Sequence, residues 1–171
     1  MHAILIRHPA VLVAPGTCYG RLDVELHPDA AAEVARLRAV VATFAGPVWT
    51  SPARRCRAIA GTCAIVDARL RELDFGDWEG RAWATVPHAD LDRWAADPLG
   101  FAPPGGESGA ALLARVAAFH VAMRRHGADC LIVAHGGPLK LLAAMLRDAP
   151  PDLLAPAPPL GSVTRIACRA G

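Results

Sequence analysis

The stretch that decides the fold is CLIVAHGGPLKLLAAML, residues 130–146. Residues 130–134 are entirely apolar, which is typical of a strand buried on both faces of a sheet. The polarity changes abruptly at His135-Gly136-Gly137, and Pro138 is expected to open a helix that continues to residue 146. A buried strand that passes through a polar turn into a helix is typical of α/β proteins, in which helices cover a parallel sheet.

Outward from this stretch, strands and helices alternate along the whole chain. The apolar patterns predict further strands over residues 3–6, 48–50, 65–66 and 162–168, and helices over residues 28–44, 53–63, 90–96 and 108–126. Residues 69–106 hold three of the four tryptophans and are expected to form a long excursion over the sheet edge, and 149–159 an irregular loop. We therefore predict a three-layer α/β/α sandwich with a mostly parallel central sheet, folded as a single domain over residues 1–171.

Two of the predicted helices carry local boundary signals. Ser51-Pro52 supplies an N-cap residue and a proline at the first helical position before residues 53–63. Ser108 is expected to cap the helix over 108–126, and Gly127 to stop it. Glu107-Ser108 is accordingly interpreted as a helix cap and loop anchor.

The composition limits the classes of protein to which the chain can belong. Its 171 residues are 53% apolar and 20% charged, which is enough to bury a sizeable core. A formal charge of +2 is too weak for a non-specific nucleic-acid binder. The sequence has no run of about 18 apolar residues, and its first residues lack a secretion signal, so we expect a cytoplasmic protein that does not bind a membrane. The five cysteines are widely spaced, which predicts mainly buried thiols rather than disulfides or a zinc site.

Polar side chains that suit phosphate follow the predicted strands. One strand ends at Arg7-His8, another ends at His135, and the helix after residues 48–50 carries Arg54 and Arg55 in its first turn. Because ligands bind beyond the carboxyl ends of parallel strands, these segments are expected to converge on one crevice. Two histidines, arginine forks and helix N-termini in one place favour a compact, doubly charged anion such as phosphate. We therefore interpret Arg7 and Arg55 as phosphate clamps.

Five motifs, in order, resemble those of the histidine phosphatase superfamily, which has the phosphoglycerate mutase-like fold. They are Leu5-Ile6-Arg7-His8, Thr50-Ser51-Pro52-Ala53-Arg54-Arg55, Leu70-Arg71-Glu72-Leu73-Asp74-Phe75-Gly76-Asp77-Trp78-Glu79-Gly80, Pro104-Gly105-Gly106-Glu107-Ser108 and Val133-Ala134-His135-Gly136-Gly137. Each motif is weak alone, but together they cover nearly the whole chain. Within the superfamily, residues 16–23 and 161–164 most resemble alpha-ribazole phosphatases of cobalamin biosynthesis.

The resemblance implies a role for each matched residue. His8 would attack phosphorus, Glu72 would donate a proton, and Arg7, Arg55 and His135 would hold the phosphoryl oxygens. The implied reaction is hydrolysis of a small-molecule phosphate ester, most closely alpha-ribazole 5′-phosphate, through a phosphohistidine and without a metal or other cofactor.

Elementary chemistry agrees with the roles of His8 as nucleophile and Glu72 as proton donor that the resemblance implies. A neutral imidazole is nucleophilic when its second nitrogen is hydrogen-bonded, and we expect a backbone carbonyl as that partner of His8. A carboxylic acid can protonate a departing alkoxide and then deprotonate water, which suits Glu72. Gly136, Tyr19 and Arg21 are further candidates for substrate contact. The leaving-group pocket is expected from Tyr19, Arg21 and the excursion over 78–101.

Alternatives remain for several residues at this point. Arg54 competes with Arg55, which we favour because the family pattern Ser-Pro-Leu-x-Arg ends there. Glu79 competes with Glu72 as the acid. Pro9 stands where most family members have glycine, which removes a backbone N–H donor beside the nucleophile.

Other functional classes are also compared. Two histidines and a carboxylate resemble a metal-ligand triad, but neighbouring arginines would repel a divalent cation. A phosphatase of another metabolite, a phosphoglycerate mutase-type transferase and a catalytically silent phosphate-binding domain are the remaining alternatives. Mutases of this fold are generally longer and all the expected residue types are present, so a hydrolase is favoured. The sequence gives no indication of oligomeric state.

Overall fold

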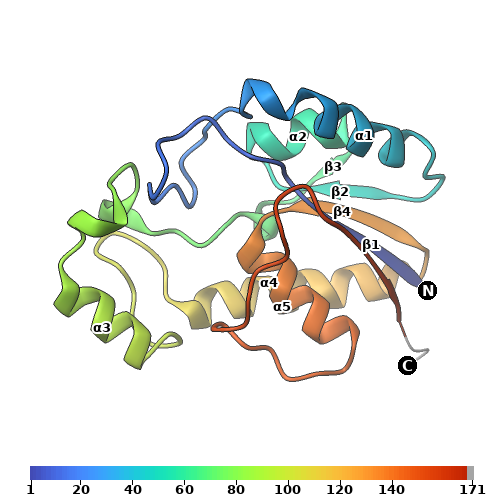
Figure 1. Ribbon diagram of the computed structural model, residues 1–171. Helices are drawn as coiled ribbons and strands as arrows, with labels where there is room; N and C mark the ends of the chain where they lie inside the picture. The colour runs from blue at the N-terminus through green and yellow to red at the C-terminus, as the bar shows by residue number, and fades with distance from the viewer. Residues whose placement is uncertain (169–171) are drawn as a thin grey trace.

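The centre of the fold is a five-stranded sheet with the strand order β3-β2-β4-β1-β5 (Figure 1). The computed structural model describes residues 1–168. The strands are β1 (His2–Arg7), β2 (Val48–Thr50), β3 (Ile65–Val66), β4 (Cys130–Ala134) and β5 (Val163–Ala167). Strand β4 is parallel to β1 and β2, and β2 to β3, whereas β5 runs antiparallel to β1. The predicted α/β class with a mostly parallel sheet is confirmed.

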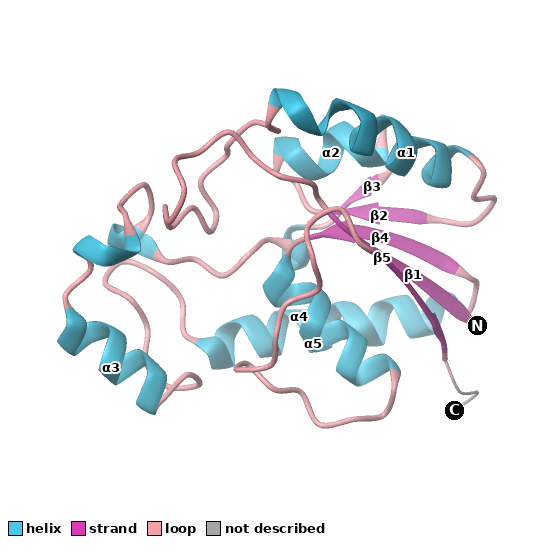
Figure 2. Ribbon diagram, viewed as in Figure 1, coloured by secondary structure: helices cyan, strands magenta, loops and turns pink. Residues whose placement is uncertain are grey.

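Helices cover both faces of this sheet (Figure 2). Helices α1 (Ala31–Ala42) and α2 (Arg54–Ala60) lie on one face, and α4 (Gly109–His126) and α5 (Gly136–Leu146) lie on the other. Helix α3 (His88–Ala96) stands apart from the sheet, and short 3-10 helices occur at Pro28–Ala30, Ala68–Leu70, Gly76–Trp78 and Trp83–Thr85. Within residues 1–168, no helix has both the length and the apolar character needed to cross a bilayer.

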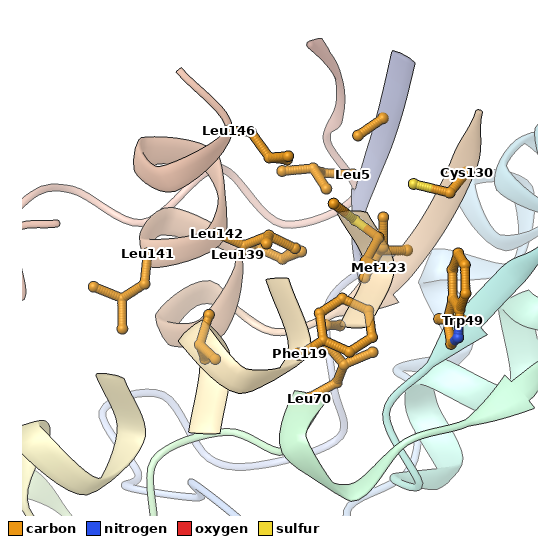
Figure 3. Packing of buried hydrophobic residues seen from close by; sticks show 14 of the residues in the cluster. Leu5, Trp49, Leu70, Phe119, Met123, Cys130, Leu139, Leu141, Leu142 and Leu146 are labelled. Carbon is orange, nitrogen blue, oxygen red and sulfur yellow. The ribbon is translucent and has the colours of Figure 1, made fainter. Parts of the chain in front are cut away.

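Strand β4 explains why residues 130–134 carry no polar side chain. Its side chains alternate between two cores, so both faces of the strand are buried. Cys130 and Ile132 face the core beneath α4 and α5, whereas Leu131 and Val133 face the core beneath α1 and α2. Figure 3 shows the first of these cores, to which α4 and α5 contribute Phe119, Met123, Leu139, Leu142 and Leu146.

Two helix starts differ from the sequence prediction. Helix α2 begins at Arg54, and Ser51 does not cap it. The Ser51 N–H instead donates to the Val133 carbonyl (3.0 Å), so Ser51 extends the pairing of β2 with β4. Helix α5 begins at Gly136, before Pro138. The proline is tolerated there, since a residue in the first helical turn donates no intrahelical hydrogen bond.

The ends of α4 lie where the sequence predicts them. The Ser108 hydroxyl accepts a hydrogen bond from the Ala111 N–H (3.2 Å). Gly127 adopts a left-handed conformation with φ of 72°, which a residue with a side chain adopts only with strain, and the helix stops there. Glu107 anchors a loop, because it accepts a hydrogen bond from the Asp74 N–H (3.2 Å).

The segment over residues 75–101, which includes α3, builds a small aromatic core of its own. Trp78 is buried, and its ring centroid lies 6.0–6.2 Å from those of Trp83, Trp94 and Phe101. In Figure 1 this segment lies beyond the carboxyl ends of the parallel strands. It therefore borders the end of the sheet at which α/β proteins bind ligands.

The cysteines are free thiols. Cys63 is exposed and the other four are buried, as the spacing in the sequence predicts. Burial raises the pKa of the Cys56 thiol to about 12, so this residue is an uncharged core side chain.

Candidate active site

The two strand-terminal histidines meet at the carboxyl end of the sheet. His8 follows β1, and its N–H donates to the Ala134 carbonyl of β4 (3.2 Å). His135 follows β4 directly and is the N-cap residue of α5. Both side chains are buried, and their ring centroids are 5.2 Å apart. The pairing of β1 with β4 thus brings together two histidines that are distant in the sequence.

The His8 ring is held in one tautomer. Its Nδ1 donates to the Pro9 carbonyl (2.7 Å), which is the backbone partner that the sequence predicts. Its Nε2 accepts a hydrogen bond from Nε of Arg55 (3.3 Å). Burial, with smaller effects from the charges of Arg55 and Arg7, lowers the pKa of His8 to about 3. The imidazole is therefore neutral near pH 7, and its lone pair is on Nε2.

Arg55, rather than Arg54, reaches the histidines. Its Nη2 contacts Nδ1 of His135 (3.2 Å), and its guanidinium also donates to the carbonyls of Gly20 and Leu22 (both 2.8 Å). Arg54 instead projects into solvent. There it pairs with Glu25 (3.4 Å) and Asp23 (4.0 Å). The helical turn thus sends adjacent arginines in different directions.

His135 is fixed by Arg55 and Ser51, and the Cys56 sulfur lies 3.6 Å from its Nε2. Because a guanidinium only donates, Nδ1 of His135 is the acceptor from Arg55, and its Nε2 donates to the Ser51 hydroxyl (2.8 Å). Burial, and secondarily the charge of Arg55, lowers the pKa of His135 well below its ordinary value. Ser51 is a site residue that the sequence analysis missed, because a serine before proline has the ordinary signature of a helix cap.

Arg7 lies at the end of β1 beside the N-terminus of α5. Its Nη1 donates to the Pro158 carbonyl (2.6 Å), while its Nε is buried and has no hydrogen-bond partner within residues 1–168. A Cβ on Gly136 would lie 3.2 Å from the Arg7 guanidinium carbon. The absence of a side chain at residue 136 therefore lets the helix N-terminus approach this cation closely.

Glu72 reaches the same N-terminus from the irregular segment after β3. Its Oε1 accepts hydrogen bonds from the N–H groups of Leu73 (3.0 Å) and Gly137 (3.1 Å), and Oε2 shares the second of these (3.2 Å). A side chain at residue 137 would collide with this carboxylate. The Glu72 carboxylate thus lies beside the first turn of α5, where it contacts Gly137, the residue after Gly136.

A polar cavity of about 270 Å³ lies beside these groups, and neither Arg7 nor His8 is among the residues that line it. Its walls include Arg21, Asp23, Ser51, Arg55, Arg71, Glu72 and His135. His8 lies against two of these walls, because Arg55 and His135 both contact its ring. The cavity therefore has the size and charge of a site for a small anion.

Glu79, the alternative acid, is used differently. Its carboxylate accepts hydrogen bonds from the backbone N–H groups of Arg21 (2.8 Å), Leu22 (2.6 Å) and Phe75 (3.0 Å). These bonds tie the loop after β1 to the segment that carries Glu72. Glu79 is not among the walls of the polar cavity.

The other two candidates for substrate contact have partners within the protein. The Tyr19 ring centroid lies 5.4 Å from the Arg55 guanidinium carbon. Arg21 lines the cavity, but its guanidinium pairs with Asp74 (2.9 Å) and Glu107 (3.0 Å).

Arg115 of α4 is a further residue that the sequence analysis missed. It donates to the backbone carbonyls of Arg69 (2.8 Å), Arg71 (2.6 Å) and Glu72 (2.9 Å), and it pairs with Glu107 (2.5 Å). The available sequence signal is a charged residue beside the apolar face of the helix. Arg115 fixes the backbone from which the Glu72 side chain projects.

The described part of the chain contains no group of three or more His, Cys, Asp or Glu side chains arranged to hold a metal ion. The site is instead built from a neutral histidine pair, arginines and the carboxylates of Glu72 and Asp23.

Several known proteins are similar to this chain in sequence or in fold. A protein of Hydrogenobacter thermophilus, whose name provisionally calls it a phosphoserine phosphatase, is 32% identical over 143 residues, 77% of this chain and 70% of its own. The adenosylcobalamin/alpha-ribazole phosphatase of Salmonella typhimurium is 37% identical over 87 residues, 47% of this chain and 43% of its own. The crystal structure of the alpha-ribazole phosphatase from Shigella flexneri has a TM-score of 0.86 at 23% identity, covering 98% of this chain and 90% of that one.

The fold and the site together define an α/β protein with a histidine and arginine pocket at the carboxyl end of its sheet. The profile described as histidine phosphatase superfamily (branch 1) matches residues 3–171. This chain therefore belongs to the histidine phosphatase superfamily, as its motifs predict. The relatives above are named as phosphatases of different metabolites, and the match spans less than half of the Salmonella protein.

Proposed function

We propose that this chain is a phosphomonoesterase that hydrolyses a small-molecule phosphate ester through a phosphohistidine on His8. The observation that carries the proposal is the state of the His8 ring. Its Nδ1 hydrogen is held by the Pro9 carbonyl, its Nε2 faces Arg55, and burial keeps it neutral. The lone pair is therefore on the nitrogen that must attack phosphorus.

In the first step, the Nε2 lone pair of His8 forms a bond to phosphorus while the bond from phosphorus to the ester oxygen breaks. The departing oxygen takes that electron pair and a proton from the carboxylic acid of Glu72, and it leaves as an alcohol. Oε1 of Glu72 accepts two backbone N–H bonds whereas Oε2 shares only one of them, so we assign the transferred proton to Oε2. The phosphorylated ring is positively charged because Nδ1 keeps its hydrogen, and the Pro9 carbonyl stabilises that charge.

In the second step, water attacks phosphorus and gives a proton to the Glu72 carboxylate. The bond from phosphorus to Nε2 breaks, its electron pair returns to the His8 ring, and inorganic phosphate leaves. We assign Arg7, Arg55 and His135 to the equatorial phosphoryl oxygens, where negative charge spreads in the transition state. His135 can take this role when its one ring N–H, on Nε2, turns from the Ser51 hydroxyl to the phosphate. Arg7 lies near enough to both histidines for its charge to lower the pKa of each, which supports this assignment.

The proposed reaction needs no metal ion. Two guanidinium groups, those of Arg7 and Arg55, supply the positive charge that a divalent cation otherwise supplies at a phosphoryl group. For the ester itself we propose alpha-ribazole 5′-phosphate. The support is the resemblance of residues 16–23 and 161–164 to such phosphatases, together with the identity to the Salmonella protein. The single domain, the cytoplasmic location and the lack of a nucleic-acid or membrane partner stay predictions from the sequence.

The test of the mechanism is to trap the intermediate. Brief incubation with a radiolabelled phosphomonoester, followed by an alkaline quench, should leave an acid-labile phosphate on the wild-type protein and none on His8→Ala. His88→Ala removes an exposed histidine of α3 and is the matched control, which should retain the label. Turnover by His8→Ala at a rate near that of the wild type would exclude His8 as the nucleophile.

The test of the substrate is a panel of phosphomonoesters. It should include alpha-ribazole 5′-phosphate, phosphoserine and a phosphoglycerate ester. We expect the highest kcat/KM for alpha-ribazole 5′-phosphate, and a higher value for either of the other two would reassign the substrate while leaving the mechanism intact.

A further inference from the structure

A second cavity shares the Glu72 side chain with the polar cavity. It has a volume of about 370 Å³ and lies among the segment after β3, α3 and the first turns of α4 and α5. Its walls are mainly apolar and include Phe75, Trp94, Pro98, Leu112 and Leu153. Glu72 is the residue common to the walls of both cavities. The proposed proton donor therefore stands where a polar cavity and an apolar cavity adjoin.

The two cavities differ sharply in charge. Arg55 and His135 line the polar cavity, together with Arg21 and Arg71. The one cation among the described walls of the apolar cavity is Lys140, and its ammonium donates to the carbonyls of Leu153 and Ala155. Because these carbonyls engage the Lys140 ammonium, the apolar cavity offers little to a phosphate. It is suited to a group that gains free energy by leaving water.

We propose that the apolar cavity binds the alcohol portion of the substrate, and that this portion carries an aromatic or branched apolar group. This inference rests on the proposed function but not on the identity of the alcohol. The phosphoryl group needs the arginines, the carbon skeleton needs the apolar walls, and the ester oxygen between them must lie beside the proton donor. The position of Glu72 on both cavities meets all three requirements.

The aromatic walls strengthen the assignment. The rings of Phe75 and Trp94 meet edge to face, with centroids 5.7 Å apart and an interplanar angle of 85°. Such a corner offers both a ring face and a ring edge to an aromatic ligand. The sequence analysis placed the leaving-group pocket on residues 78–101 together with Tyr19 and Arg21. Trp94 fits that expectation, whereas Tyr19 and Arg21 do not line this cavity.

The test compares two primary alkyl esters, 2-phenylethyl phosphate and propyl phosphate. Their reacting atoms are alike, so a difference in kcat/KM reports on the rest of the alcohol. Burial of a phenyl-sized group corresponds to an advantage of about 10- to 100-fold for the phenylethyl ester. Equal kcat/KM values for the two esters in the wild-type protein would overturn the proposal.

Two neighbouring alanines of α3 provide matched variants. Ala95 lines the cavity and Ala96 does not, although both are exposed. Ala95→Phe should narrow the cavity and reduce the preference for the phenylethyl ester to within about 3-fold, whereas Ala96→Phe should keep the wild-type preference. An unchanged preference in Ala95→Phe would also overturn the proposal.

Binding of the product alcohol gives a readout that does not depend on turnover. Titration with 2-phenylethanol should change the fluorescence of Trp94 in the wild-type protein and in Ala96→Phe, and should have a smaller effect in Ala95→Phe. No response in the wild type would count against the cavity. Failure to form a phosphohistidine with either ester would instead overturn the proposed function, so the two failures are distinguishable.

Discussion

Acid should destabilise this protein through His8 in particular. The His8 side chain has an ordinary pKa of 6.5 in the unfolded chain, but burial and the nearby arginines lower the pKa to about 3 in the folded protein. Between these two values the unfolded chain binds a proton that the folded protein does not bind. The free energy of unfolding therefore falls as the pH falls from 6.5 toward 3. Between about pH 7.5 and about pH 4.5, this group alone should lower it by about 3 kcal/mol.

The assay is urea unfolding of the wild type and of His8→Asn at both pH values. Asparagine keeps a donor beside the Pro9 carbonyl but does not titrate, so the variant should lose about 3 kcal/mol less than the wild type as the pH falls. His135, whose pKa is also lowered, is present in both proteins, and its contribution largely cancels. His88→Asn removes an exposed histidine and should retain the wild-type loss. Equal losses in the wild type and His8→Asn would refute the neutral, buried state of the proposed nucleophile.

Four further changes test the proposed site. Glu72→Gln should slow hydrolysis of an alkyl phosphate by about 10²- to 10⁴-fold but affect a nitrophenyl phosphate far less, because a nitrophenolate leaves without a proton. In the same kinetic assay Glu79→Gln should show no such contrast, and equal losses on both esters would remove the proton-donor role from Glu72. Arg55→Gln should abolish the trapped phosphohistidine and Arg54→Gln should retain it, whereas the reverse would move the phosphate clamp by one residue. Activity measured with a chelator should be unchanged and vanadate should inhibit it, while a loss restored by added metal would contradict metal independence. Arg115→Met should lower the free energy of unfolding, measured in urea, by about 3 kcal/mol, and it should reduce kcat more for alkyl than for nitrophenyl phosphates. Arg115→Lys should recover part of the stability and part of the kcat. Identical losses of kcat on the two esters would limit Arg115 to a structural role.

Much of the sheet could be predicted from the sequence because burial on both faces leaves a wholly apolar strand. Residues 130–134 carry that pattern most clearly, and they form the strand between β1 and β2. The start of α2 could not be predicted in the same way. Ser51 has the local features of a cap, but its hydroxyl accepts a hydrogen bond from His135, which is distant in the sequence. A tertiary contact thus overrides the local preference.

The convergence of His8, His135 and Arg55 could also be predicted, because each follows a parallel strand and such strands end together. The choice between Glu72 and Glu79 could not, since both lie in one irregular segment without a period. What separates them is the hydrogen bonding of their oxygens: backbone donors of two loops surround Glu79, whereas Glu72 lines the cavity. Every residue except proline has a backbone N–H, so the sequence does not reveal which of these groups bind a given carboxylate.

A proton donor on irregular backbone needs rigid neighbours, because a misplacement of about 1 Å can cost about 100-fold in rate. Arg115 of α4 fixes the backbone of Glu72, and the Gly137 N–H of α5 fixes its carboxylate. The proposed nucleophile, His8, is held by the same segment of chain. Its N–H donates to the carbonyl of Ala134, the last residue of β4, and its Nε2 accepts from Arg55, which also contacts His135. Residues 130–146 carry β4, His135 and the whole of α5 without a break. The distance between the proposed nucleophile and the proposed acid is therefore set by the strand, turn and helix that also organise the sheet. A side chain at residue 137 should displace the Glu72 carboxylate and impair the proposed acid step before it impairs the fold.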